Sequence, residues 1–225
     1  MALLGAAVLA IWNDVAPGGD AEFNHWHTRE HIPERVGVPG FLRGRRYAAL
    51  AGGPAYFTLY ETESLETLRG GAYIARLNDP TAWSRRVLPL FRNNNRSACR
   101  VTHSLGRGVG GTLATLRLGP LPDGETELRA WLTATTLPVV GEQPGIVGVH
   151  LCEVDLGATR VPSQEQKLRD RADQTARWIV LVESGGPEPV EMVCRTFMSS
   201  EQLARRGATG DSVLDVYRLL YCLAR

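Results

Sequence analysis

The order of apolar and polar positions predicts a run of strands and helices in the first half of the chain. Four stretches are continuously apolar or alternate in polarity, as strands do: 3–12, 41–50, 56–61 and 97–105. Three others have the spacing of helices: 20–31, 64–77 and 81–91. We expect the first helix to end at about His31, because the residue before Pro33 avoids the α conformation.

The second half repeats this order. It predicts strands near 112–118, 146–154, 177–183 and 213–223, and helices near 124–137 and 188–205. A shift of 105 residues, which places Trp26 on Trp131, aligns 19–45 with 124–150 without a gap. The aligned stretches share identical residues, among them Pro33/Pro138 and Gly40/Gly145. We interpret the chain as two tandem copies of one unit, 1–107 and 108–225.

Each predicted unit has the βαββαβ order of a ferredoxin-like fold. Two such units can pack sheet against sheet, which buries the face that each four-stranded sheet would otherwise expose. The expected fold class is therefore α+β, with two tandem ferredoxin-like repeats packed as a pseudo-dimeric α+β barrel.

One charged stretch of the second half, from about Leu156 to Ala176, has no counterpart in the first. It contains little apolar material between its charged residues, which are Arg160, Glu165, Lys167, Arg169, Asp170, Arg171 and Asp173. We expect an exposed surface loop, or at most a short surface helix, with mobility above the average.

Composition and charge exclude several classes of partner. The 225 residues are 44% hydrophobic and 22% charged, which is typical of a globular protein, and the net charge is only +1. No basic field exists to hold a nucleic acid or an anionic membrane surface, so neither partner is expected. The first apolar run stops at Asn13, too early to span a membrane, and the four cysteines show no CxxC spacing. These features favour a cytoplasmic protein with reduced thiols.

The string EFNHWHTREHIPERVGVPGFLRGRRY, followed by AYFTLYETES, resembles the dimeric α+β barrel superfamily, and within it the EthD-like and stress-responsive branch. In that branch the first helix ends in a W/Y-x-x-E-H-x-P pattern, matched here by Trp26 or His27, Glu30, His31 and Pro33. The resemblance implies a cleft for small, often aromatic or polyketide-like molecules. It also implies cofactor-free cyclases, isomerases, decarboxylases and monooxygenases, beside members with no assigned activity.

The repeat makes one helix face of the first unit unusual. The second unit places Leu132, Thr135 and Thr136 where the first has His27, Glu30 and His31. Burying three ionisable groups costs several kcal/mol unless they are paired or line a wet pocket. One interpretation is a pocket in which His31 and His27 are catalytic acids or bases near neutral pH, with Trp26 and Glu30 binding the ligand. The other is a satisfied polar helix end, with His31 capping backbone carbonyls and Glu30 paired to an arginine.

Strand residues supply further candidates. Alternation along 41–50 places Arg43, Arg45 and Tyr47 on one face. We predict catalytic roles for Arg45 and Tyr47, which could steady a carboxylate, enolate or phenolate, and ligand binding by Arg43. The alternative is an ion pair of Arg45 with Glu30, Glu34 or Glu61. Tyr60 and His103 are predicted to line the ligand site, although strand residues of these types are usually packing residues.

Two motif matches are rejected. The stretch from His27 to His31 fits the inverted zinc-peptidase pattern H-x-x-E-H, but Pro33 interrupts the helix and no downstream acidic ligand helix is evident. The stretch from Gly106 to Gly111 fits the dinucleotide pattern G-x-G-x-x-G, but no helix follows it to receive a pyrophosphate. We therefore predict no metal and no cofactor.

The sequence thus predicts a small-molecule-binding α+β barrel protein. One hypothesis is a cofactor-free isomerase, cyclase, decarboxylase or monooxygenase that acts on an aromatic or carbonyl compound by proton transfer to His31. Such a base is expected to titrate near neutrality, so that activity falls as the pH drops through about 6. The alternative is a non-catalytic ligand-binding or stress-associated structural protein. The partner expected is a small molecule, and a homodimer remains possible.

Overall fold

The computed structural model describes residues 3–51, 53–169 and 172–225. Its strands form one closed barrel in the order β1-β3-β2-β8-β5-β7-β6-β4, and every neighbouring pair is antiparallel. The strands are β1 (Ala7–Val15), β2 (Phe41–Ala51), β3 (Tyr56–Thr62), β4 (Phe91–Gly106), β5 (Thr112–Leu118), β6 (Ile146–Val154), β7 (Trp178–Ser184) and β8 (Val213–Ala224). The expected α+β class with an antiparallel barrel is therefore found.

Each half of the chain supplies four consecutive strands of the barrel. The first half gives β4-β1-β3-β2 and the second gives β8-β5-β7-β6, so the fourth, first, third and second strand of each half follow in the same order. The two sheets join where β2 pairs with β8 and where β4 pairs with β6. Because the last strand of each half closes on the second strand of the other, neither sheet keeps a free edge.

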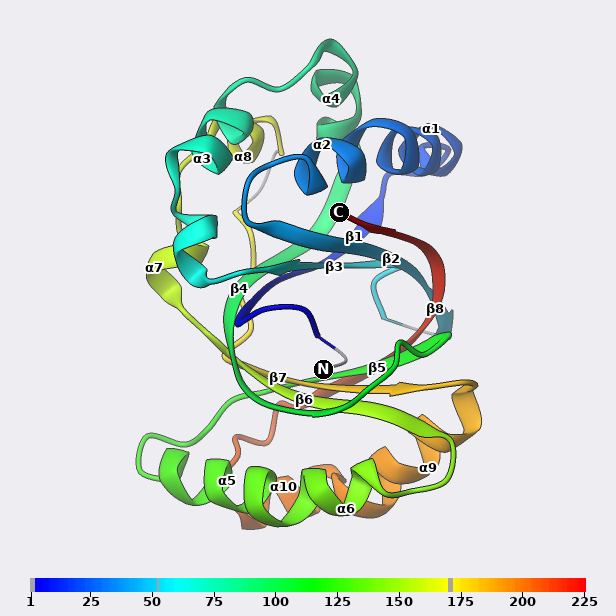
Figure 1. Ribbon diagram of the computed structural model, residues 1–225, viewed down its shortest axis with the longest axis vertical. Helices are drawn as coiled ribbons and strands as arrows, with labels where there is room; N and C mark the ends of the chain where they lie inside the picture. The colour runs from blue at the N-terminus through cyan, green and yellow to red at the C-terminus, as the bar shows by residue number, and fades with distance from the viewer. Residues whose placement is uncertain (1–2, 52, 170–171) are drawn as a thin grey trace.

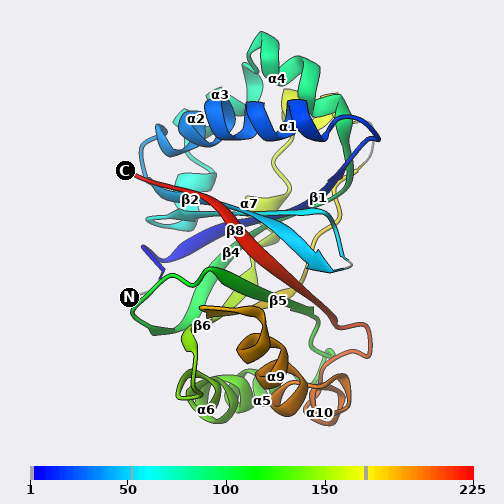
Figure 2. The same cartoon turned by 90° about the vertical axis from the view of Figure 1, so that its right-hand side faces the viewer.

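Helices cover the two outer faces of the barrel in separate layers (Figures 1 and 2). One layer comes from the first half and comprises α1 (Asp20–Trp26), α2 (Ile32–Val36), α3 (Gly71–Asn78) and α4 (Ala82–Val87). The other comes from the second half and comprises α5 (Glu125–Trp131), α6 (Leu137–Gly141), α9 (Pro187–Phe197) and α10 (Ser200–Arg205). Among the described residues, no helix combines the length and the apolar character needed to cross a membrane.

The first helix does not end at His31 as the sequence predicted. A π-helical turn, His27–His31, links α1 to α2, and the N–H of Ile32 donates to the carbonyl of His27 five residues earlier. Pro33 lies in the first turn of α2, where its missing N–H is tolerated. The second half has the same device, with the π turn Leu132–Thr136 before Pro138. The helix therefore continues to Val36 and carries further side chains toward the sheet.

Alternation along the strands separates two kinds of core. Side chains such as Trp12, Tyr47 and Phe57 fill the barrel interior, whereas Leu9 and Tyr60 face the first-half helices. The second-half helices pack on their own apolar cluster. The face on which a strand residue lies therefore decides whether it can reach the space beneath the helices.

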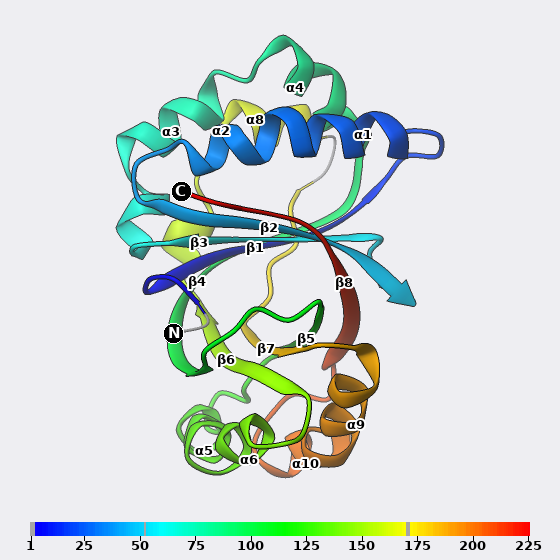
Figure 3. The same cartoon turned by 45° about the vertical axis from the view of Figure 1, so that its right-hand side comes forward.

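The charged stretch of the second half is not the exposed loop that we expected. It forms α7 (Leu156–Thr159) and α8 (Gln164–Leu168), and α8 packs on α3 in the first-half helix layer (Figure 3). Glu165 is only 3% exposed and Ser163 7%. Glu165, Arg169 and Asp173 have ion-pair partners, so a polar composition does not force exposure. Asp170 and Arg171, which belong to the same prediction, lie outside the described residues.

Candidate functional site

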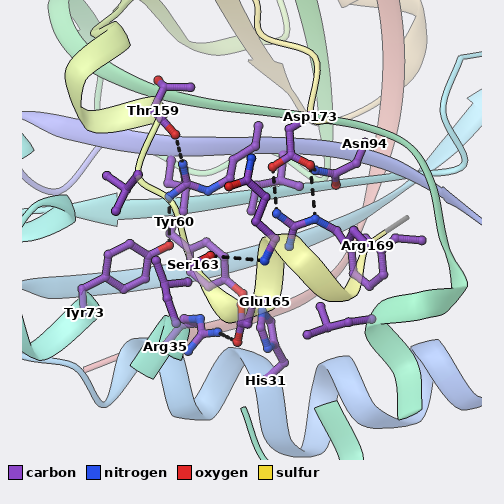
Figure 4. Close-up of a pocket in the computed structure, with 18 residues that line it drawn as sticks. His31, Arg35, Tyr60, Tyr73, Asn94, Thr159, Ser163, Glu165, Arg169 and Asp173 are labelled. Carbon is purple, nitrogen blue, oxygen red and sulfur yellow. Dashed lines mark hydrogen bonds and ion pairs between the residues drawn. The ribbon is translucent and has the colours of Figure 1, made fainter. Parts of the chain in front are cut away.

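A cavity of about 50 Å³ lies between the first-half sheet, its helices and the charged segment of the second half (Figure 4). Leu9, Ile11 and Phe91 give it apolar walls. Its polar walls come from distant parts of the chain and comprise His31, Arg35, Tyr60, Tyr73, Asn94, Arg96, Thr159, Ser163, Glu165, Gln166, Arg169 and Asp173. The site is therefore built by both halves.

His31 lines this cavity from the end of the π turn. Its ring packs on Trp26 with 4.2 Å between the ring centroids, and the side chain is buried. Among the described residues, its buried Nδ1 has no hydrogen-bond partner. Burial lowers the pKa of His31 well below its ordinary value, and the positive charge of Arg35 lowers it further. The imidazole is therefore neutral, and it is not a cap for backbone carbonyls.

Trp26 is held in place by a small hydrogen-bond network. Its indole N–H donates to Ser84 Oγ at 3.1 Å. The hydroxyls of Ser84 and Thr81 both donate to Glu30 Oε1, at 3.3 and 2.6 Å. Glu30 thus pairs with hydroxyl groups of the α4 region rather than with an arginine. This network fixes the aromatic surface on which His31 rests.

Tyr60 reaches the cavity from β3, where it lies opposite Leu9 in the register of β1. Its hydroxyl is buried and has no hydrogen-bond partner in the described part of the chain. Burial raises the pKa of Tyr60 far above its ordinary value, an effect that the Arg35 charge only partly offsets. The side chain is therefore a protonated phenol with a hydrogen bond left to donate.

An ion-pair network fastens the charged segment over the cavity. Arg35, one helical turn after His31, contacts Glu165 of α8 and pairs with Glu34 at 3.1 Å. Arg76 of α3 also pairs with Glu34 at 3.1 Å. Burial raises the pKa of Glu34, although Arg35 opposes the shift. Because these groups are largely removed from water, the Arg35–Glu165 contact is a strong tie between the two halves.

Three of these residues could offer ligand atoms to a metal ion. A ring nitrogen of His31 and a carboxylate oxygen from each of Glu34 and Glu165 lie within 4.8 Å of one another. The guanidinium of Arg35 already pairs with both carboxylates, so a metal ion would have to displace a buried positive charge. The sequence could not indicate this set, because Glu165 comes from a segment with no counterpart in the first half.

A second hollow, of about 220 Å³, adjoins the cavity and shares Phe91, Asn94 and Arg169 with it. Its other lining residues include the exposed Arg92 and Asn93. Arg169 pairs with Asp173 at 2.7 Å and Asn94 donates to Asp173 at 2.7 Å, so these three side chains stand where the two spaces meet (Figure 4).

Arg45 and Tyr47 do not share the space of His31, so that prediction was wrong. Both project into the barrel interior, on the opposite side of the sheet. Arg45 is fully buried between Glu61, at 2.9 Å, and Glu183 of the second half, at 2.8 Å. The geometry thus agrees with the alternative of an ion pair with Glu61. The pattern of β2 identified a shared face, but it could not tell which face points inward.

The other predicted residues have separate surroundings. Arg43 pairs with Glu61 on the interior face. His27 is buried against Phe23, and burial, with Arg46 next, lowers its pKa well below the ordinary value. His103 follows an irregularity in β4, and neither it nor His27 lines the cavity. Of the predicted site residues, His31 and Tyr60 are therefore the two that the cavity brings together.

Comparisons with solved structures support the barrel assignment. An anthrone oxidase-like protein superposes with a TM-score of 0.64 at 12% identity, covering 97% of this chain and 92% of the other. A candidate monooxygenase from Fusobacterium nucleatum superposes at 0.63 with 9% identity, covering 99% and 96%. A candidate chlorite dismutase superposes at 0.56 with 13% identity, covering 97% and 96%.

The chain has the dimeric α+β barrel fold. No family model matches the sequence, and no curated protein does. At these identities the likeness extends to the fold alone.

Within this barrel, sequence reasoning missed the residues that complete the cavity. Arg35 was detectable, because it continues the His27, His31 series at helical spacing. Arg169 and Asp173 are spaced as a helical ion pair, which could have suggested order in the charged segment. Nothing local to Arg96 or Thr159 indicated a common site, because their meeting depends on how the segment returns to the first half.

Proposed function

We propose that this barrel binds a small molecule in the His31 cavity and acts on it as a cofactor-free enzyme, by proton transfer to His31. The observation that carries the proposal is a neutral imidazole whose Nδ1 has no hydrogen-bond partner among the described residues, lining the same cavity as the Tyr60 hydroxyl, which has none there either. Two fold neighbours are named as an anthrone oxidase-like protein and a monooxygenase, which favours an aromatic or carbonyl compound as the substrate.

The two groups have complementary roles. His31 accepts a proton from the bound substrate, because its lowered pKa keeps it unprotonated. The same shift makes it a weak base, so the substrate must be acidic, with a C–H beside a carbonyl or an activated aromatic hydroxyl. Tyr60 donates a hydrogen bond to the oxygen on which negative charge develops. The reaction class is therefore enolisation, and isomerisation or oxygenation are steps that an enolate can enter.

Two further fold neighbours are named as a chlorite dismutase and as a haem-binding protein from Thermus thermophilus. A haem does not fit, because its macrocycle exceeds both the cavity of about 50 Å³ and the adjoining hollow of about 220 Å³, whereas a molecule of one to three rings can extend from one space into the other. The side chain that would ligate iron there, His31, is packed against Trp26. We derive no step through this group.

We also propose that the chain is a tandem duplication of units 1–107 and 108–225, in which the second copy lost its site. The matching strand orders and the matching π turns before Pro33 and Pro138 support this history. Placement in the EthD-like branch rests on the sequence pattern of Trp26, Glu30, His31 and Pro33. A homodimer and a cytoplasmic location remain predictions of the sequence.

A non-catalytic ligand-binding or stress-associated structural protein is the second candidate function, and the small volume of the cavity favours it. The test that separates the two follows deuterium exchange at the acidic carbon of anthrone and of cyclic 1,3-diketones in D2O. We expect the wild-type protein to accelerate exchange and His31→Ala to lose the acceleration. His25→Ala is the matched control, because His25 is exposed on the same helix. Binding without accelerated exchange supports the non-catalytic function instead.

A further inference from the structure

One of the arginines that line the cavity has no carboxylate partner among the described residues. Arg35, Arg96 and Arg169 line it together with only two carboxylates, Glu165 and Asp173. Arg35 pairs with Glu165, and Arg169 pairs with Asp173. The guanidinium of Arg96 is therefore the positive charge left over.

Arg96 is held rigidly but by neutral partners. It is 8% exposed, donates to the carbonyl of Thr159 at 2.7 Å and donates to the Tyr73 hydroxyl at 3.2 Å. Within residues 3–51, 53–169 and 172–225, no carboxylate forms an ion pair with it. A buried charge is costly unless a charge of opposite sign lies beside it. An anion in the cavity would supply that partner.

The surroundings of Arg96 define the rest of such a ligand. Ile11 lies opposite Arg96 in the register of β1 and β4, and Leu9 lies opposite Tyr60 in the register of β1 and β3. All four residues line the cavity. The two hydrogen-bond donors, on β4 and β3, thus flank two apolar side chains of β1 on one sheet face. This surface suits a flat apolar body that carries one anionic oxygen group.

We propose that the ligand of this cavity is a small aromatic or unsaturated monocarboxylate, and that Arg96 binds its carboxylate. The proposal rests on the proposed function of the cavity and specifies the substrate class. A planar guanidinium offers two parallel N–H donors to a carboxylate, which an amide or an ester cannot match. The guanidinium of Arg35, which already pairs with Glu34 and Glu165, also argues against a divalent cation at His31 and these two carboxylates.

The test compares two probes of nearly equal shape, 4-fluorobenzoate and 4-fluorobenzamide, by fluorine NMR titration at neutral pH. We expect wild-type protein to bind the benzoate at least about tenfold more tightly, as a charge-assisted hydrogen-bond pair provides. Arg96→Gln should abolish this preference and Arg96→Lys should retain part of it. Arg100→Gln, which changes an exposed arginine on the same strand, should leave it unchanged.

The results distinguish a failure of the carboxylate proposal from a failure of the proposed function. Equal binding of the two probes to wild-type protein overturns the carboxylate proposal, as does a preference that survives in Arg96→Gln. If anthrone exchange still depends on His31, the proposed function stands after either result. If neither probe binds and no exchange is accelerated, both proposals fail.

A crystal structure of the wild-type protein with 4-bromobenzoate tests the assignment without any variant. The bromine atom identifies the position of the probe. A carboxylate within hydrogen-bond distance of Arg96 supports the proposal, and a carboxylate bound elsewhere overturns it.

Discussion

The two helix layers of this barrel share a backbone device but differ in what lies beneath it. In the second half, the helix with the π turn places Leu128, Leu132 and Leu137 in a fully buried apolar cluster. In the first half, the equivalent helix places His31 and Arg35 against a polar cavity. The same fold thus provides packing in one half and a site in the other.

Polar side chains on the helix do not explain this difference alone. The cavity of the first half is closed by Ser163, Glu165 and Arg169, which the second half contributes through its additional segment. Without that cover, Arg35 would lose its contact with Glu165. The comparison teaches that a site in one copy of a fold can depend both on that copy's polar groups and on a covering segment from the other copy.

The largest effect should come from making the first half resemble the second. His27→Leu with His31→Thr introduces the residues that the second half uses at those positions. We expect exchange activity to fall by about 10²–10⁴-fold, because the proton acceptor is lost. The melting temperature should change by only a few degrees, as no hydrogen bond of His31 is broken.

Thr136→Ala is the matched control for this swap, because Thr136 aligns with His31. It should leave activity intact, as checked by the same exchange assay. Full activity in the double variant would show that the polar helix face is structural.

The barrel interior, where the halves meet, should be the most sensitive region for stability. Arg45→Ala leaves Glu61 and Glu183 buried without the cation between them. We expect the free energy of unfolding to drop by about 3–5 kcal/mol in urea titrations. Arg129→Ala, which removes a half-exposed ion pair with Glu153 in the second half, should cost less than about 1 kcal/mol. Equal losses of unfolding free energy in Arg45→Ala and Arg129→Ala would mean that the buried ion pairs of the interior add no more stability than the half-exposed pair.

Acid should destabilise the first half through its histidines. Burial lowers the folded-state pKa of His27 and His31, so the unfolded chain takes up protons first as the pH falls below about 6.5. Their contribution to stability is complete above that pH. Below it, stability should decline by about 1.4 kcal/mol per pH unit for each imidazole.

Urea unfolding from pH 7 to pH 5 measures this slope. The His27→Leu, His31→Thr variant should show a flatter profile than the wild type. Activity should persist at pH 6, in contrast to the fall that an ordinary histidine predicts. Identical profiles for the two proteins would contradict the burial of both rings.

The smallest effect concerns the cover itself. Glu165→Gln keeps the shape of the side chain but weakens the tie to Arg35, and we expect a loss of about 1–2 kcal/mol. Limited proteolysis should then cut within 156–176 faster, while cleavage elsewhere stays slow. Glu201→Gln, which alters an exposed pair in α10, should leave the cleavage pattern unchanged. Unchanged cleavage in Glu165→Gln would show that Arg35 does not hold the segment.

Local pattern was sufficient to predict much of the fold. Periodicity located the strands, and the alignment of Trp26 with Trp131 led to the βαββαβ order in both halves. The pattern wrongly predicted that the helix ends before Pro33. It could not reveal the π turn that accommodates this proline, because such a turn does not change the order of apolar and polar residues. It singled out His31 because the second half provides an internal reference at Thr136.

The rest of the site depends on contacts between residues far apart in the chain. We predicted a common role for Arg45 and His31, but the alternation along a strand only separates its two faces. It does not say which face points into the barrel and which points to the helices. Glu165 was judged exposed because charge usually means solvent, and its partner Arg35 is 130 residues away. Such contacts form because the charged segment of the second half folds back over the sheet of the first half.

The position of the covering segment also has a consequence for the order of biosynthesis. A ribosome completes the strands and helices of the first half well before it adds Glu165 and Asp173. During that interval the covering segment is absent, so the cavity beside His31 is open to solvent and Arg35 lacks its partner Glu165. The pocket can therefore mature only late in translation, and a chaperone that shields this surface would act on the first half while the second is still being made.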